Sequence, residues 1–252
     1  MPHVGLDLRR LDPECALSLR SMAGKIAHDM NNMLVPLAAY PELLRCFVEG
    51  QDEATGYIDS MEKALDGITC FMRRLLALSG RDRGERVVHD MNDMAVAAAS
   101  VVSEVCPGIA VECSRGGETA AILCDIESLD MAVREICSNA FEAMPSGGKL
   151  WISTGLKSEG GGRTSTCGLL VPAGEYAWLR VQDSGHGMSE GEMSSLFCPL
   201  ESAKHRGGRR GAGMGLSLVW VTVRDHGGHI DVSSGKEGTT VSVSLPTMRE
   251  GV

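Results

Sequence analysis

Positive charge, long apolar runs and an apolar leader are what this 252-residue sequence lacks. It has 24 Lys and Arg against 33 Asp and Glu, a net charge of -9, which excludes broad electrostatic binding to nucleic acid or to an anionic membrane. No apolar run approaches the roughly 18 residues of a membrane span. Charged side chains also interrupt the first twenty residues, where a signal peptide needs an apolar core. We therefore expect a cytoplasmic protein with no nucleic-acid partner and no membrane partner.

Closely spaced cysteines are also missing. The nine cysteines are odd in number, and none belongs to a short-spaced pair of the kind found in zinc knuckles and redox motifs. We interpret them as small buried hydrophobic residues in a reducing compartment. With 43% apolar side chains, the chain is long enough for one large domain or two modest ones.

Glycine, in contrast, is abundant and unevenly placed. Of the 31 glycines, ten lie in residues 1–139 and twenty-one in the remaining 113 residues. The early part has the apolar periodicity of helices, whereas the later part combines helices with short strands. The skew predicts two domains, a helical one over residues 1–80 and an α+β one over residues 86–248.

Residues 1–80 predict a helical hairpin. Asp12 followed by Pro13 is typical of a helix start, and Pro36 and Pro41 predict a kink within the first helix. Because two apolar stripes bury too little surface alone, we expect two copies to pair as a homodimeric four-helix bundle. Packing of the hairpin on the rest of the same chain is the alternative. The stripes, with steps of three and four, are Leu19, Met22, Ile26, Met30, Met33, Leu37, Tyr40 and Leu44, then Ile58, Met61, Leu65, Ile68, Met72 and Leu75.

Residues 86–248 predict an α/β sandwich, a mixed sheet covered by helices on one face. The Gly- and Ser-rich stretch 158–168 predicts a flexible excursion between two strands. Helical patterns cover residues 91–105, 128–144 and 216–223, and strand patterns cover residues 87–88, 109–112, 121–123, 150–154, 177–182, 229–232 and 239–245.

Two glycine clusters mark a candidate ligand site. Asp183 ends a strand, and Gly185 and Gly187 follow it, so a carboxylate acceptor stands beside backbone that a flat ligand can approach. The cluster at residues 211–215 opens a helix whose free amides suit a phosphate, without the spacing of a Rossmann fingerprint or a P-loop. An ordinary turn and a solvated surface loop are the alternatives. Five potential cations precede the second cluster, as in a lid over a polyphosphate: Lys204, His205, Arg206, Arg209 and Arg210.

Polar residues on the helix at 128–144 suit a metal ion. Glu135, Asn139 and Glu142 are spaced by four and three residues and share one face. An Asn in a helix interior is unfavourable without a partner. A Mg²⁺ ion that bridges phosphate oxygens is such a partner, since it needs only a few oxygen ligands and keeps several waters. An ordinary Asn on the helix surface is the alternative.

In order and spacing, these motifs resemble those of the sensor histidine kinases, whose ATP-binding fold gyrase, a mismatch-repair ATPase and the ninety-kilodalton chaperones share. Residues 135–144 resemble the asparagine box, residues 183–187 the first glycine box and residues 211–217 the second. Residues 196–199, with Lys204, resemble the phenylalanine box and lid. Residues 27–34 are similar to the phosphoacceptor box in the variant with Asp-x-Asn-Asn after the histidine.

The helix geometry agrees with this resemblance. Ile26 and Met30 belong to the apolar stripe, and His28 lies about 200° around the helix from Ile26. We therefore expect His28 to face solvent, as a phosphoacceptor must. An ordinary exposed histidine is the alternative.

The resemblance implies a histidine kinase of a two-component system that uses ATP and Mg²⁺. His28 would attack the γ-phosphoryl group, Asp29 would take or orient the ring proton, and Asn32 would orient water when a partner regulator is dephosphorylated. Asp183 would accept a hydrogen bond from the adenine amino group. The residues so implicated are Asn139, Asp183, Gly185, Gly187, Lys204, Gly211, Gly213 and Gly215 for the nucleotide, Asn139 and Glu135 for the metal, and His28, Asp29 and Asn32 for catalysis.

The implied partners are a second copy of the chain, the receiver domain of a response regulator, and a separate sensory protein or a sensor domain outside this sequence. Three other functions stay open. They are a histidine phosphotransferase on the same frame that does not use ATP, an ATP-gated conformational ATPase of the gyrase or chaperone type, and a dimerisation module with an inactive pocket. In the gated ATPase, Glu135 would activate water.

Overall fold

The computed structural model of the protein describes residues 30, 33–34, 37–45, 47–48, 52–79, 84–194, 196–197 and 215–248. The chain separates into two compact units, Met1–Asp82 and Arg83–Val252. Within the described residues, no helix is both long enough and apolar enough to cross a membrane.

In the described part of the first unit, two helices lie side by side. Residues 37–45 are helical across Pro41, and α2 spans Asp52–Ser79. Arg45 joins them, because its Nη2 lies 2.6 Å from Asp59 Oδ1 and 2.7 Å from Glu62 Oε2. These ion pairs connect residues 14 and 17 positions apart, which is the geometry of a hairpin.

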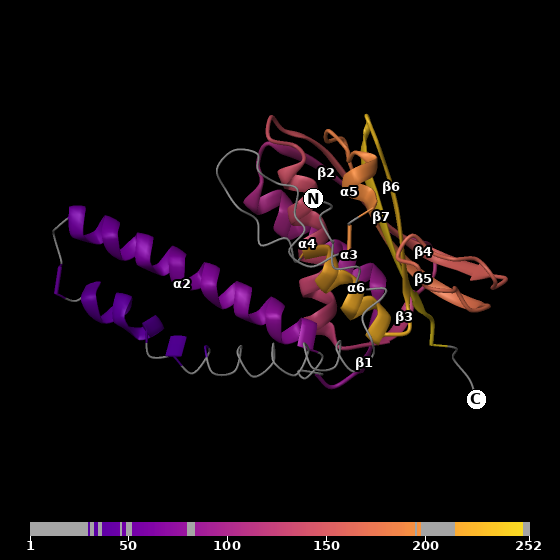
Figure 1. Ribbon diagram of the computed structural model, residues 1–252, viewed down its shortest axis with the longest axis horizontal. Coiled ribbons are helices and arrows are strands. Elements are labelled where there is room, and N and C mark those ends of the chain that lie inside the picture. The colour runs from indigo at the N-terminus through magenta and orange to yellow at the C-terminus, as the bar shows by residue number, and fades with distance from the viewer. Residues whose placement is uncertain are drawn as a thin grey trace, which may run out of the picture. The chain divides into compact units, whose positions relative to one another are not determined.

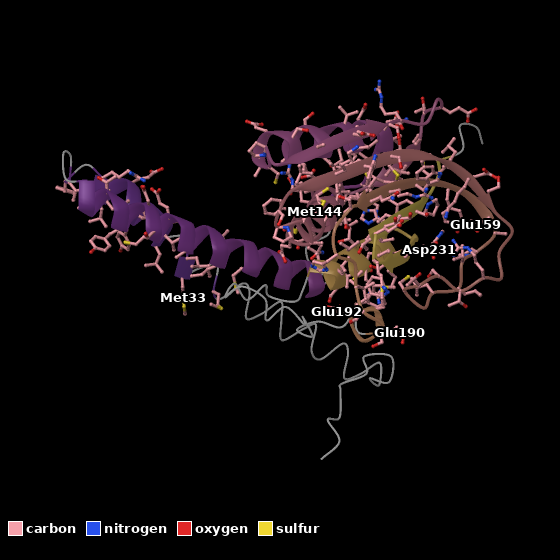
Figure 2. The ribbon with its side chains drawn as sticks, turned by 90° about the horizontal axis from the view of Figure 1, so that it is seen from above. Met33, Met144, Glu159, Glu190, Glu192 and Asp231 are labelled. Carbon is pink, nitrogen blue, oxygen red and sulfur yellow. The ribbon has the colours of Figure 1, made fainter. Side chains whose placement is uncertain are left out.

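The apolar stripes of this hairpin are only partly covered. Ile58 and Met72 are buried, at 4% and 1% exposure. Ile68 is 40% exposed and Met33, which projects from its helix in Figure 2, is 69% exposed. Some stripe residues of the hairpin are therefore buried, and a second apolar set is accessible.

The second unit contains two sheets. β1 pairs with β3 in an antiparallel ribbon, and the main sheet has the order β2-β4-β5-β7-β6. β2 runs parallel to β4, and every other neighbouring pair is antiparallel. The strands are β1 (Val87–Asp90), β2 (Ile109–Ser114), β3 (Ala121–Cys124), β4 (Gly148–Glu159), β5 (Gly174–Asp183), β6 (His229–Gly235) and β7 (Gly238–Pro246).

Helices α3 (Met91–Val105), α4 (Ile126–Glu142) and α6 (Gly215–Asp225) lie on one face of the main sheet (Figure 1). A short helix, α5, spans Glu190–Ser194. Asp90 and Asp125 cap α3 and α4, because their side chains accept the backbone N–H groups of Asn92 and Ser128. The expected sandwich, a mixed sheet covered by helices on one face, is confirmed. Its largest fully buried apolar side chains are Met91, Ile122, Leu129, Leu150, Ile152, Leu179, Leu218, Ile230 and Leu245.

The connection between β4 and β5 differs from the flexible excursion expected at residues 158–168. β4 continues through Glu159, and Arg163 Nη2 then lies 2.7 Å from Glu159 Oε1 and 2.8 Å from Asp231 Oδ2. Figure 2 shows Glu159 and Asp231 close together at one end of the sheet. Farther along, Thr166 Oγ1 accepts the Val232 N–H at 3.1 Å. The connection is therefore anchored along β6, an edge strand, and covers backbone that an edge leaves open.

This connection also covers part of the sheet face that carries no helices. Ile230 belongs to the core on the helix side of the sheet, so the neighbouring His229 lies on the opposite face. The His229 side chain is nevertheless only 1% exposed. Its Nε2 lies 3.1 Å from Arg163 Nη2 and 3.3 Å from Lys157 Nζ, so Nε2 accepts from two groups that can only donate. Burial, together with the charge of Lys157, lowers the pKa of His229. His229 is therefore neutral and holds the connection as a hydrogen-bond acceptor.

Candidate functional site

Asp183 is a buried carboxylate at the end of β5, with 4% exposure. Its Oδ1 accepts the backbone N–H of Gly185 at 2.8 Å and of Thr239 at 3.2 Å. Burial raises the pKa of Asp183, and these two hydrogen bonds and the nearby His186 oppose that rise. Among the described residues, Oδ2 receives no hydrogen bond. Asp183 therefore keeps one carboxylate oxygen for a donor on a ligand.

Gly185 and Gly187 let the turn after Asp183 pack tightly against the protein itself. A Cβ at Gly185 would lie 2.6 Å from the Ala143 carbonyl oxygen, just past the end of α4. Gly187 has φ +67, and a Cβ there would overlap the Gly235 carbonyl oxygen. The sequence pattern indicated backbone that a flat ligand can approach, whereas in the structure the end of α4 approaches Gly185 and β6 approaches Gly187.

Glu135, Asn139 and Gly215 come together where α4 packs against the start of α6. A Cβ at Gly215 would lie 2.7 Å from Glu135 Oε2 and 3.4 Å from Asn139 Nδ2. Glu135 is 8% exposed and Asn139 is half-buried, whereas Glu142 is exposed. The start of α6 therefore packs closely against one carboxylate and one carboxamide, at a position where a side chain larger than glycine would clash.

These side chains suit a magnesium ion that also binds phosphate. Within the described residues, no three His, Cys, Asp or Glu side chains form a metal site alone. The Glu135 and Asn139 side chains offer oxygen ligands, and Mg²⁺ in nucleotide sites combines one or two protein oxygens with phosphate oxygens and water. The donor set therefore fits a nucleotide-bound Mg²⁺.

The two parts of the site meet on the last turns of α4. Asn139 lies one turn before Ala143, whose carbonyl oxygen accepts the His186 N–H at 3.2 Å. α4 thus holds the turn after Asp183 through its C-cap residue Ala143 and carries Asn139 and Glu135 one and two turns earlier. The remaining expected site residues lie outside the described residues: His28, Asp29, Asn32, Lys204, Gly211 and Gly213.

Sequence reasoning missed the contribution of the β6–β7 hairpin. Thr239 supplies a backbone N–H to Asp183, and Ser234 Oγ accepts the Met188 N–H at 2.8 Å. A signal was present, because Ser234 and Thr239 are polar residues at strand positions that continue the core-facing alternation of Val232 and Val241. Phe197 of the expected phenylalanine box packs against the core.

A family model described as histidine kinase-, DNA gyrase B- and HSP90-like ATPase matches residues 124–249, which is half of the chain. The chain belongs to this family. The matched region runs from the start of α4 to the end of β7, so it contains every site residue that the structure describes.

Among curated proteins, members of this family with kinase names are similar to the chain along most of its length. It is 27% identical to the sensor kinase CckA of Brucella abortus over 91% of this chain and 24% of that protein. It is 24% identical to sporulation kinase D of Bacillus subtilis, with 90% and 41% coverage. It is 25% identical to the sensory histidine kinase/phosphatase NtrB of Vibrio alginolyticus, with 96% and 67% coverage. The chain therefore spans well under half the length of the first two.

Solved structures of histidine kinases share the fold. Full-length ShkA in complex with AMPPNP superposes with a TM-score of 0.70 at 16% identity, covering 92% of this chain and 47% of that one. The Acinetobacter baumannii histidine kinase AdeS gives a TM-score of 0.55 at 14% identity, with 87% and 98% coverage. Together with the family match and the kinase relatives, this confirms the resemblance, and the chain carries a sensor histidine kinase core.

Proposed function

We propose that this member of the ATPase family is an ATP-dependent protein-histidine kinase that phosphorylates its own His28 and passes the phosphoryl group to an aspartate of a response-regulator receiver domain. The observation that carries the proposal is the buried Asp183 carboxylate. Its Oδ1 accepts two backbone N–H groups, and its Oδ2 is left to accept a donor of the ligand. Adenine offers an amino donor to such an acceptor. Guanine offers a carbonyl oxygen there, which would leave two acceptors facing each other in a dry site.

The second support is the close approach of Gly215 to Glu135 and Asn139. In the proposed complex, Asn139 and Glu135 hold the Mg²⁺ ion, and Gly215 with Gly211, Gly213 and Lys204 holds the phosphates. A side chain at position 215 would press on Glu135 Oε2. The bound metal supplies charge neutralisation for the phosphates, and the helix amides add positive partial charge.

The transfer itself rests on the sequence motif around His28. An imidazole nitrogen of His28 bonds to the γ-phosphorus of ATP while the bond from that phosphorus to the bridging oxygen breaks, and ADP leaves. Asp29 takes the ring proton or orients the ring. Asn32, four residues after His28, is placed to orient water when the regulator is dephosphorylated. This chemistry needs mainly positioning and charge neutralisation.

The exposed apolar stripe supports the homodimer. Of the stripe residues that the structure describes, Ile58 and Met72 are buried, and the following are at least 40% exposed: Met33, Leu37, Tyr40, Leu44, Met61 and Ile68. A second copy that covers this stripe would complete a four-helix bundle. We further propose that a sensory protein or a sensor domain outside this sequence supplies the input signal.

One observation favours a second candidate function. Glu135 is buried and lies four residues before Asn139, with Oε2 close to Gly215. A carboxylate in that place could activate water for ATP hydrolysis, as an ATP-gated conformational protein requires. Such a protein would consume ATP without phosphorylating His28.

The test is incubation with γ-labelled ATP and Mg²⁺. We expect acid-labile, alkali-stable label on the protein, lost in His28→Ala and kept in the control His89→Ala, which changes a histidine of β1. Label that persists in His28→Ala overturns the acceptor assignment. ATP consumption without protein label supports the gated ATPase instead.

A further inference from the structure

The β6–β7 hairpin contacts the turn after Asp183 through backbone at two places. A Cβ at Gly187 would overlap the Gly235 carbonyl oxygen, and a Cβ at Gly238, which has φ +121, would overlap the Asp183 carbonyl oxygen. Each contact has a glycine where no larger residue fits. The backbone of the hairpin therefore packs directly against the backbone of the turn.

Two hydrogen bonds hold the turn at both of its ends. At the first end, Thr239 donates its backbone N–H to Asp183 Oδ1 at 3.2 Å. At the other end, Met188 donates its backbone N–H to Ser234 Oγ at 2.8 Å. Ser234 and Thr239 are cross-strand partners whose hydroxyl oxygens lie 2.8 Å apart. The two hydroxyl groups, together with the Thr239 backbone N–H, thus connect the Asp183 carboxylate to Met188, from which the chain leaves for α5.

We propose that Ser234 is a positioning residue for nucleotide binding, which fixes the turn 183–188 through Met188 and through Thr239. The inference rests on the proposed function, because Asp183 is assigned there to the adenine amino group. Ser234 itself is not assigned a contact with the nucleotide. The Ser234 hydroxyl oxygen accepts the Met188 N–H, and the hydrogen bond between the Ser234 and Thr239 hydroxyl groups keeps both side chains oriented.

Removal of this hydroxyl leaves the Met188 N–H without its acceptor and frees one end of the turn. A hydrogen bond of this kind contributes about 0.5 to 1.5 kcal/mol, so Ser234→Ala is expected to weaken binding of Mg-ADP about three- to tenfold. The rate of His28 labelling at saturating ATP should stay within about twofold of wild type, because the chemistry is untouched. The split between affinity and rate distinguishes positioning from general loss of structure.

Ser233 provides a matched control. It is the neighbouring serine of the same strand and is exposed on the other face, so Ser233→Ala should bind Mg-ADP as wild type does. Ser234→Thr and Ser234→Val form a second control, because Thr and Val have the same shape but only Thr has a hydroxyl group. Thr and Val are both good strand formers. We expect Ser234→Thr to bind Mg-ADP more tightly than Ser234→Val, and this pair decides the matter if Ser234→Ala does not fold.

The experiment is equilibrium titration of the whole chain with Mg-ADP, beside labelling by γ-labelled ATP over a range of concentrations. Binding by Ser234→Ala and Ser234→Val equal to wild type, while Asp183→Asn loses binding, overturns the role of Ser234 and leaves the proposed function standing. Equal loss of affinity and labelling rate, with a lowered unfolding temperature, also overturns it, because Ser234 is then a structural residue only. Absence of Mg-ADP binding by the wild-type chain overturns the proposed function itself.

Discussion

Replacement of Asp183 by Asn changes one oxygen of a buried carboxylate into an NH₂ group and keeps the shape of the side chain. In the wild type, Oδ1 accepts the N–H groups of Gly185 and Thr239 at 2.8 and 3.2 Å. Asn can keep those bonds with its oxygen, but then its NH₂ group faces the adenine amino group, donor against donor. If it turns over instead, both backbone N–H groups lose their acceptor. The first orientation therefore loses the hydrogen bond to the ligand, and the second loses the two hydrogen bonds within the turn.

The magnitude follows from the charged hydrogen bond that is lost. Hydrogen bonds to an ionised partner contribute about 1.5 to 3 kcal/mol, so Asp183→Asn should weaken ATP binding by about 2 to 3 kcal/mol, about 30- to 150-fold. Stability should change in the other direction. Because burial raises the pKa of Asp183, the ionised group costs free energy in the folded protein at neutral pH, and a neutral Asn removes that cost. The nucleotide-free variant should therefore unfold at the wild-type temperature or above it.

The assay is calorimetric titration with Mg-ATP, paired with thermal unfolding without nucleotide. Asp93→Asn, which changes an exposed Asp in the first turn of α3, is the control and should match wild type in affinity. The reasoning is refuted if Asp183→Asn binds ATP as tightly as wild type. It is also refuted if affinity falls only because the nucleotide-free variant is already unfolded.

Three further predictions concern packing, charge and assembly. Gly185→Ala should lower the free energy of unfolding by about 1 to 3 kcal/mol, since its Cβ meets the Ala143 carbonyl oxygen at 2.6 Å; in denaturant titrations Gly191→Ala, with open space around it, should show no loss. Arg163→Gln should cost about 1 kcal/mol at neutral pH after solvent screening. Because Arg163 and Lys157 lower the pKa of Glu159 from 4.5 to about 2, this stabilisation is present above pH 4.5 and fades as the pH falls towards 2, so unfolding curves of variant and wild type should converge in acid. Ile68→Asp should convert a dimer into monomers in light scattering, and a dimer that survives it contradicts the bundle interface.

Much of the second unit could be predicted from local sequence, because its elements carry local signals. α3 occupies the expected residues 91–105, since Asp90 supplies a cap and apolar side chains recur at helical spacing. α4 spans residues 126–142 where 128–144 was expected, β5 spans 174–183 where 177–182 was expected, and the first glycine box follows β5. These features depend on residues a few positions apart, which a pattern can reveal.

The rest depends on contacts between distant residues. The stretch 158–168 has the composition of a linker, yet Arg163 pairs with Asp231, 68 positions later. Ser234 bonds to Met188, 46 positions earlier, and neither residue belongs to a recognisable motif. Composition predicted mobility where Arg163 and Thr166 hold the connection to β6. The structural role of the two glycines after Asp183 was equally hidden, because it requires the positions of Ala143 and Gly235.

The anchored β4–β5 connection also has a consequence for protein synthesis. Arg163 and Thr166 take their partners, Asp231 and Val232, from 68 and 66 residues farther along the chain. At about 5 to 20 residues per second, a ribosome needs about 3 to 14 s to make those partners after the connection itself. During that interval Arg163 has only Glu159 of its two carboxylate partners, and the edge strand that the connection covers has not yet been made. The nucleotide-binding unit therefore gains the cover of its sheet edge only as the last two strands leave the ribosome.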